Sequence, residues 1–221
     1  GTDHGYIPVY LAQTGRIASA LAMDVRPGPL ERAQAHVRDY EERERARRQD
    51  VWAVPIHLRL SDGLKELKPG EADTVIIAGM GGELIIKILD EGRHVWDSVK
   101  QYILSPQSDL DKVRRYLAAH GFAIEDEAMV KDEGKYYTVM SVKRGFMEYE
   151  SQAHYLYGKI LIDKKDVILR EYLGREMLRI EKILVSLQAK DGITDTETRA
   201  EARISRQKEL SWIKEAQDEM Q

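Results

Sequence analysis

Short apolar runs alternate with segments of helical spacing up to Gly121. The runs predict buried strands, and apolar positions three and four apart predict helices that pack on them. The predicted strands are 17–23, 56–60, 74–78 and 101–104, and the predicted helices are 6–13, 27–48 and 109–120, with a short helical turn at 64–67 and a further helix from about Leu84 to Gly92. This order indicates an α/β fold with a doubly wound, Rossmann-like sheet.

The predicted helix at 109–120 has a capping residue on each side. Ser108 is a favourable N-cap, and Gly121 is a typical residue to end a helix. Beyond Gly121 the alternation of strand and helix stops. Residues 122–130 and 136–143 predict two strands joined across 131–134, so we expect the sheet to end in an antiparallel β-hairpin.

The pattern changes again from Tyr155 onward. One apolar helical face is described by Leu169, Leu173, Met177, Ile180, Leu184 and Leu187. Gly192 interrupts it, and the capping box at 194–197 predicts that a second helix follows. We therefore expect two domains: a Rossmann-like catalytic domain over 1–146 and, over 147–221, an α-helical hairpin that forms an antiparallel coiled-coil arm.

The segment from Asp73 to Leu84 is the strongest local signal in the chain. Its β-branched run ends in Gly79, Gly81 and Gly82, which indicates that something bulky approaches the backbone there. In a doubly wound sheet, ligands bind beyond the carboxyl ends of the strands. The residues predicted at those ends are Gly1–Gly5, Asp24, Asp62, Gly79–Gly82 and Ser105–Gln107.

Composition excludes several classes of function. With no cysteine, the chain has no disulfide and no thiolate metal site, and the six histidines do not pair at metal-ligand spacing. No apolar run is long enough to span a membrane. The phosphate-binding G-x-x-x-x-G-K-[ST] and nucleophile G-x-S-x-G motifs are missing. We expect a cytoplasmic protein that needs no metal and no membrane.

The acidic residues at the strand ends help to choose among adenosine cofactors. Asp24 is suited to a ribose diol, which a dinucleotide and S-adenosylmethionine share. Asp3 and Asp62 add negative charge, which repels a pyrophosphate and favours a cation. Residues 79–84 miss the G-x-G-x-x-G pattern because Leu84 replaces its third glycine. S-adenosylmethionine is therefore favoured; a dinucleotide-dependent oxidoreductase and a non-catalytic coiled-coil interaction module remain alternatives.

Four motifs carry a resemblance to a known family. They are Thr2-Asp3-His4-Gly5-Tyr6-Ile7-Pro8, Ile77-Ala78-Gly79-Met80-Gly81-Gly82, Ser105-Pro106-Gln107 and Glu133-Gly134-Lys135-Tyr136-Tyr137. With these motifs the chain resembles the bacterial tRNA (adenine-22-N1)-methyltransferase family over almost its whole length. The resemblance implies a class I methyltransferase that uses S-adenosylmethionine and a tRNA substrate gripped partly by the helical arm. We expect a monomer or a weak homodimer.

The resemblance also implies roles for individual residues. The cofactor-binding set is Gly1, Asp3, His4 and Gly5 in a loop, Asp24 at the ribose, Asp62 and Gly63 at the adenine, and Gly79, Met80, Gly81 and Gly82 around the methionine moiety. The catalytic set is Asp3, Tyr6, Pro106 and Gln107. Within it, Asp3 would act electrostatically, Pro106 and Gln107 would face the target base, and Gln107 and Tyr6 would orient it.

The chemistry of the target makes modest demands on these residues. Adenine N1 already carries a lone pair, so it can take the methyl group by in-line displacement without a strong base. Proximity and alignment, which can lower a barrier by about 7–11 kcal/mol, would supply most of the catalysis.

The chain departs from the family pattern in two places. The family has an N-terminal helix and then a strand that ends in an acid two positions before the equivalent of Gly1, and this sequence shows neither. Relatives often have Q-P-N at the strand end where this chain has Ser105-Pro106-Gln107. That strand would be central in the sheet, and a sheet that lacks its central strand leaves the backbone hydrogen bonds of both adjacent strands unmade. We therefore expect the 221 residues to be a truncated copy of a longer chain.

Overall fold

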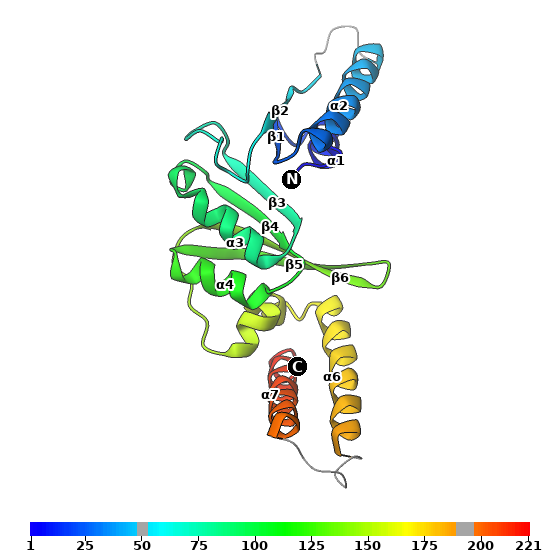
Figure 1. Ribbon diagram of the computed structural model, residues 1–221, viewed down its shortest axis with the longest axis vertical. Helices are drawn as coiled ribbons and strands as arrows, with labels where there is room; N and C mark the ends of the chain where they lie inside the picture. Colours follow the sequence, from blue (N-terminus) through cyan, green and yellow to red (C-terminus); the bar gives the residue numbers. More distant parts are fainter. Residues whose placement is uncertain (48–52, 189–196) are drawn as a thin grey trace. The chain divides into compact units, whose positions relative to one another are not determined.

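The computed structural model describes residues 1–47, 53–188 and 197–221 (Figure 1). These residues form two compact units. The first contains Gly1–Val75 and Ile86–Lys100, and the second contains Ile76–Ile85 and Gln101–Gln221. The division passes through strand β3 (Thr74–Met80) and helix α3 (Gly82–Glu91). The predicted domains, 1–146 and 147–221, remain a prediction.

The first unit contains α1 (Tyr6–Gln13), β1 (Ala20–Asp24), α2 (Pro27–Arg47), β2 (Ile56–Leu60) and a short 3₁₀ helix (Arg93–Val95). Strands β1 and β2 pair in parallel, with Asp24 opposite Leu60. The small core between these strands and the two helices contains Ala12, Ala22, Val37, Tyr40 and Ile56. The predicted strand at 17–23 begins later, at Ala20. Helix α2 matches its prediction through Arg47; residue 48 lies outside the described residues.

The short turn of helix predicted at 64–67 does not form a helix: residues 63–66 are hydrogen-bonded turns, and the amide of Leu67 donates to the carbonyl of Leu64 at 3.0 Å. The amide of Glu66 donates to Oγ of Ser61 at 3.2 Å, and the hydroxyl of Ser61 donates to the carbonyl of Gly63 at 2.9 Å. A serine side chain that competes for backbone groups in this way favours a turn over a helix. The segment after β2 is therefore held close to the strand end.

The second unit is built on the sheet order β3-β4-β6-β5. It contains β4 (Gln101–Pro106), α4 (Leu110–Ala119), β5 (Phe122–Asp132) and β6 (Lys135–Arg144). Strand β6 pairs antiparallel with both β4 and β5. Fully buried side chains include Tyr102, Leu104, Leu117, Phe122, Met140 and Val142.

The turn between β5 and β6 is shorter than predicted. Lys131 and Asp132 pair with β6, so only Glu133 and Gly134 connect the strands. Their φ angles are 46° and 77°, as a two-residue primed turn requires. Such a turn matches the twist of the strands, which explains why the ladder continues past the predicted loop.

The helical segment of the second unit begins with a π-helical turn (His154–Gly158) and α5 (Lys159–Asp163), followed by α6 (Val167–Gln188) and α7 (Glu197–Glu219). Helices α6 and α7 run side by side in Figure 1 and share a core. Of the predicted apolar face, Leu169, Leu173 and Ile180 are fully buried, and Met177 and Leu184 pack against them. The predicted break at Gly192 and capping box at 194–197 depend on positions outside the described residues.

A buried ion pair joins this helical segment to the sheet. Arg114 on α4 and Glu127 on β5 are both fully buried, and their side chains approach to 2.7 Å. Arg114 also donates to the carbonyls of Tyr155 and Leu156, at 2.7 and 3.0 Å. A Cβ atom on Gly158 would lie 2.4 Å from Glu127 Oε2, so only glycine fits beside the pair.

Candidate active site

The carboxyl ends of β1 and β2 bring the first predicted site residues together. The amide of Ser61 donates to the carbonyl of Asp24 at 2.8 Å, which places the segment 61–63 beside the end of β1. Asp24 is buried at 7% exposure. The amide of Thr2 donates to the carbonyl of Met23 at 2.8 Å, so the 1–5 loop lies at the same strand end.

The carboxylate of Asp24 is held by backbone amides. Asp3 N donates to its Oδ2 at 3.3 Å, and Arg26 N donates to its Oδ1 at 3.1 Å. Each carboxylate oxygen can accept a further hydrogen bond. The loop passes so close that a Cβ atom on Gly1 would lie 2.4 Å from Oδ2. The site therefore presents an oriented carboxylate under a glycine, a suitable partner for two neighbouring hydroxyl groups.

The loop itself is shaped by contacts with α2. Gly5 has φ +70°, and a Cβ atom there would lie 3.2 Å from the Cβ of buried Ala33. Arg32, on the same helix, pairs with Asp3 at 2.8 Å. The hydrogen bond from this guanidinium holds the pKa of the Asp3 carboxyl below its usual range. The negative charge that the sequence places in this loop is thus paired, by a residue that sequence reasoning missed.

Asp62 is paired as well. Lys65 contacts its carboxylate at 2.5 Å and lowers the pKa of that group. Gly63 has φ +63°, and a Cβ atom there would lie 3.0 Å from Ile88 Cγ1. With Asp3 and Asp62 both paired, the electrostatic preference for a cationic cofactor is weaker than the sequence alone suggests. Asp24, whose bonds are to backbone amides, is the stronger argument for a ribose.

Tyr6, a residue that is 66% exposed, lies at the start of α1. The ring stacks on His4, with centroids 5.4 Å apart and an interplanar angle of 14°. It also lies 4.9 Å from the ring of His36 on α2. His36 was not among the predicted site residues, although its i,i+4 spacing from Arg32 puts both on one face of a helix.

The glycine segment of the second unit has a different environment. Gly79 has φ +74°, and a Cβ atom there would meet nothing within 4 Å. Gly82 begins α3, and its amide donates to the carbonyl of Ser108 at 3.1 Å and to its Oγ at 3.3 Å. A Cβ atom on Gly82 would lie 2.5 Å from the Ser108 carbonyl oxygen. Gly82 therefore makes room for the chain itself, whereas the space beside Gly79 is open.

The strand end at 105–107 lies next to this segment. The amide of Gln107 donates to the carbonyl of Met80 at 2.9 Å. Pro106 is buried and Gln107 is exposed, so of the two it is Gln107 that can reach a substrate. Gly81 faces Ser108, whose Oγ would lie 3.2 Å from a Cβ atom at position 81.

Ser108 is not the N-cap of α4, contrary to the prediction. Asp109 occupies that position with φ 53° and makes no side-chain capping bond. Ser108 Oγ instead donates to Asp109 Oδ2 at 2.6 Å and accepts the amide of Gly82. The need to satisfy the first turn of α3 overrides the local capping preference.

The structure thus gathers the predicted residues into two groups, one in each unit. Residues 1–6, 24 and 62–63 belong to the first unit, and residues 79–82 and 106–107 to the second. Within the described ranges, no group of three or more His, Cys, Asp or Glu side chains could hold a metal ion. In the same ranges, no helix is long and apolar enough to cross a membrane.

Comparison with known proteins identifies the family. A family model described as tRNA (adenine(22)-N(1))-methyltransferase matches residues 1–209. The chain belongs to this family. A relative from Bacillus subtilis, named tRNA (adenine(22)-N(1))-methyltransferase, is 29% identical over 188 residues, which are 83% of this chain and 75% of the relative.

Solved structures of similar proteins agree with this assignment. A candidate tRNA (m1A22) methyltransferase from Streptococcus pneumoniae is 29% identical with a TM-score of 0.82, over 98% of this chain and 89% of that one. The same protein in complex with S-adenosyl-L-methionine gives a TM-score of 0.78 at 29% identity and the same coverage. The m1A22 tRNA methyltransferase of B. subtilis gives 0.79 at 26% identity, covering 98% and 89%.

Membership of the tRNA (adenine(22)-N(1))-methyltransferase family confirms the resemblance found in the sequence. The predicted α/β, Rossmann-like methyltransferase fold is confirmed at that level by the solved neighbours. Neither the dinucleotide-dependent oxidoreductase nor the non-catalytic module finds support. The roles of the individual site residues remain predictions. The structure brings together those within the first unit and, separately, those within the second.

Proposed function

We propose that this protein transfers a methyl group from S-adenosylmethionine to N1 of adenine 22 in tRNA. The match of the family model across residues 1–209 is the observation that carries the proposal. The S. pneumoniae relative was solved with S-adenosyl-L-methionine, which supports the same cofactor here.

The residues of the first unit fit this cofactor. The buried Asp24 carboxylate, fixed by the amides of Asp3 and Arg26, offers acceptors to both hydroxyls of the cofactor's ribose. Gly1 keeps the loop close to that carboxylate. We assign the loop residues Gly1, Asp3, His4 and Gly5 to cofactor binding, and Asp62 and Gly63 to the adenine.

The residues of the second unit are assigned on their own geometry. Gly79 has open space beside it, and Met80, Gly81 and Gly82 continue that segment, so these four are proposed for the methionine moiety. Gln107 is exposed and tied through its amide to the carbonyl of Met80. We propose that Gln107 faces the target base and that buried Pro106 fixes the backbone beside it.

The chain's catalytic contribution is orientation rather than proton removal. When bound, S-adenosylmethionine supplies a methyl group on a sulfonium, which N1 of adenine can take by in-line displacement. Because that nitrogen already has a lone pair, no general base is required. Tyr6 offers an exposed ring face for the base. We assign Asp3 an electrostatic role towards the positive charge that the base acquires; its pairing with Arg32 keeps the carboxylate ionised but offsets part of its negative charge.

We propose that α6 and α7 form an antiparallel coiled-coil arm that contacts the tRNA. The two helices share an apolar core, and they leave Leu178, Val185 and Ile204 exposed. Upstream of the arm, the π-helical turn is joined to the sheet through the buried pair Arg114 and Glu127, since Arg114 donates to the carbonyls of Tyr155 and Leu156. We further propose a monomer or weak homodimer that acts in the cytoplasm.

The test is mass spectrometry of an unmodified tRNA after incubation with the protein and S-adenosylmethionine. We expect one N1-methyladenosine, mapped to position 22 by nuclease digestion. A tRNA with guanosine at position 22 is the matched control and should gain no methyl group. Methylation at another nucleotide would disprove the position, and the absence of any methylated product would disprove the function.

A further inference from the structure

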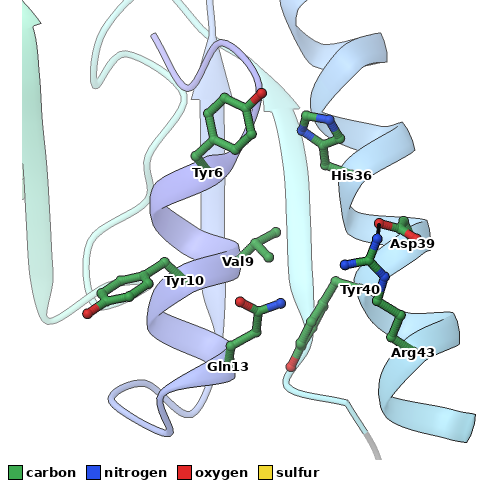
Figure 2. Close-up of a pocket in the computed structure, with 8 residues that line it drawn as sticks. All are labelled: Tyr6, Val9, Tyr10, Gln13, His36, Asp39, Tyr40 and Arg43. Carbon is green, nitrogen blue, oxygen red and sulfur yellow. Dashed lines mark ion pairs between the residues drawn. The ribbon is translucent and has the colours of Figure 1, made fainter.

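A groove lies between α1 and α2 (Figure 2). Of the residues that line it, only Tyr6 has a role in the proposed methyl transfer. Its floor is apolar, because Val9 packs into the core beside the Tyr40 ring, which is 3% exposed. The remaining lining residues are Tyr6, Tyr10 and Gln13 on α1 and His36, Asp39 and Arg43 on α2. The groove holds about 370 Å³, within the range of about 300–1,000 Å³ that small-ligand pockets occupy.

Exposed aromatic rings stand at one end of the groove. Tyr6 lies between His4 and His36, with ring centroids 5.4 and 4.9 Å away. A tyrosine that is 66% exposed as a residue contributes little to the core. Proteins that hold single-stranded nucleic acid present such rings as stacking surfaces for bases.

His36 adds a hydrogen-bond acceptor to this surface. Its Nδ1 lies 2.8 Å from the carbonyl oxygen of His4. Because a carbonyl can only accept, Nδ1 carries the proton, and Nε2 of the neutral ring is an acceptor. Across residues 1–47, 53–188 and 197–221, no hydrogen bond to Nε2 is found. An exocyclic amino group of a base is a donor that matches it.

The opposite end of the groove carries polar groups with little net charge. Arg43 pairs with Asp39 at 2.7 Å, and this pair is drawn in Figure 2. Gln13 is exposed and offers both a donor and an acceptor. A rim without excess positive charge is suited to a neutral, planar base rather than to a phosphate group.

We propose that this groove binds a second, unstacked nucleobase of the tRNA, next to the adenine that is methylated and bearing an exocyclic amino group. The proposal rests on the function proposed above. An enzyme that takes a base out of its stack leaves the neighbouring base without a partner on that side. Since the groove starts at Tyr6, which is assigned to the target base, the neighbouring nucleotide can continue along α1 and α2.

The decisive variant is His36→Asn. The asparagine amide nitrogen can keep the bond to the His4 carbonyl, while the ring and Nε2 are lost. Base stacking on aromatic side chains leads us to expect KM for tRNA to rise by about 10-fold, with kcat and the affinity for S-adenosylhomocysteine unchanged. Gln13→Ala should raise KM in the same direction. Phe146, in the other unit, is 83% exposed; Phe146→Ala also removes an aromatic ring, so it is the matched control and should change nothing.

A direct readout is a tRNA with 2-aminopurine beside position 22. We expect its fluorescence to be quenched on binding to the unchanged protein and less so with His36→Asn. Suppose that the unchanged protein methylates tRNA, and that His36→Asn and Gln13→Ala show the same KM for tRNA and the same 2-aminopurine quenching as the unchanged protein. The groove proposal is then wrong and the proposed function stands. If His36→Asn instead loses S-adenosylhomocysteine affinity, His36 only supports the loop, which also overturns the proposal. If the unchanged protein methylates no tRNA, the function itself fails.

Discussion

The two glycine-rich segments of this protein look alike in sequence and differ in what surrounds them. In the 1–5 loop, Gly1 lies against the Asp24 carboxylate, a group with acceptor capacity to spare. In the segment 79–82, Gly82 lies against the backbone of Ser108, which is a purely internal contact. A run of glycines therefore indicates close approach to something, and the structure is needed to say whether that is a ligand group or the chain itself.

The largest expected effect is a loss of cofactor affinity when Asp24, which lies against the 1–5 loop, is substituted. Asp24→Asn keeps the shape but replaces one acceptor oxygen with a donor. Because hydrogen bonds to charged groups contribute about 1.5–3 kcal/mol each, affinity for S-adenosylhomocysteine should fall by about 100-fold. Isothermal titration calorimetry measures this. Because both carboxylate oxygens accept backbone amides, the new NH2 group faces the amide of Asp3 or of Arg26, and the midpoint of thermal unfolding should also fall. An affinity within threefold of the original in the folded variant would remove Asp24 from the cofactor site.

The second prediction tests whether Gly82 serves the fold. Gly82→Ala places a methyl group against backbone that cannot rotate away, so we expect the free energy of unfolding to fall by about 1–3 kcal/mol. Urea denaturation measures it. Gly79→Ala is the matched comparison: its Cβ has space, and the left-handed φ of +74° alone should cost about 1–2 kcal/mol.

The two substitutions should also differ in cofactor binding. Gly79→Ala fills open space at the proposed methionine position and should weaken S-adenosylhomocysteine binding in the protein that remains folded. Gly82→Ala should affect binding less than it affects stability. The opposite ranking would show that Gly82, rather than Gly79, borders the ligand.

The smallest effect concerns Arg32 and its partner Asp3. Arg32 lowers the pKa of Asp3 from its ordinary value of 3.8, so the pair stabilises the fold above that pH and the stabilisation is lost as pH falls through the lowered pKa. Arg32→Gln should return the Asp3 titration towards its ordinary value. Carboxyl-detected NMR follows this titration. An unchanged midpoint would mean that the pair does not persist in solution.

Much of the fold follows from local pattern. The apolar run at 74–78 and the glycines after it predict the β3–α3 junction. The predicted strand at 17–23 is followed by Asp24, and this position at a strand end marks Asp24 as a site residue. Secondary-structure bounds are mostly right to within a few residues. The predicted hairpin connection, 131–134, is too long. Lys131 and Asp132 pair with β6, and this pairing depends on the twist of the strands rather than on the propensities of the two residues.

The missed residues are those whose role depends on distant contacts. Arg32 and His36 sit in a highly charged helix where solvated i,i+4 pairs are the ordinary expectation. Only the arrival of the 1–5 loop beside α2 gives them partners. Ser108 looks like a local cap, and the tertiary approach of Gly82 redirects it. No feature of one sequence marks such meetings of remote segments.

The buried Arg114–Glu127 pair has a consequence for how this protein can evolve. Loss of one partner leaves the other charge buried without compensation, at a cost of about 3–5 kcal/mol. Any side chain at position 158 would collide with Glu127 Oε2. Substitutions at positions 114, 127 and 158 should therefore occur together, and an alignment of relatives should show the three positions changing as a set. We therefore expect the join between the sheet and the helical segment to change slowly among relatives, and the exposed faces of α6 and α7 to vary more.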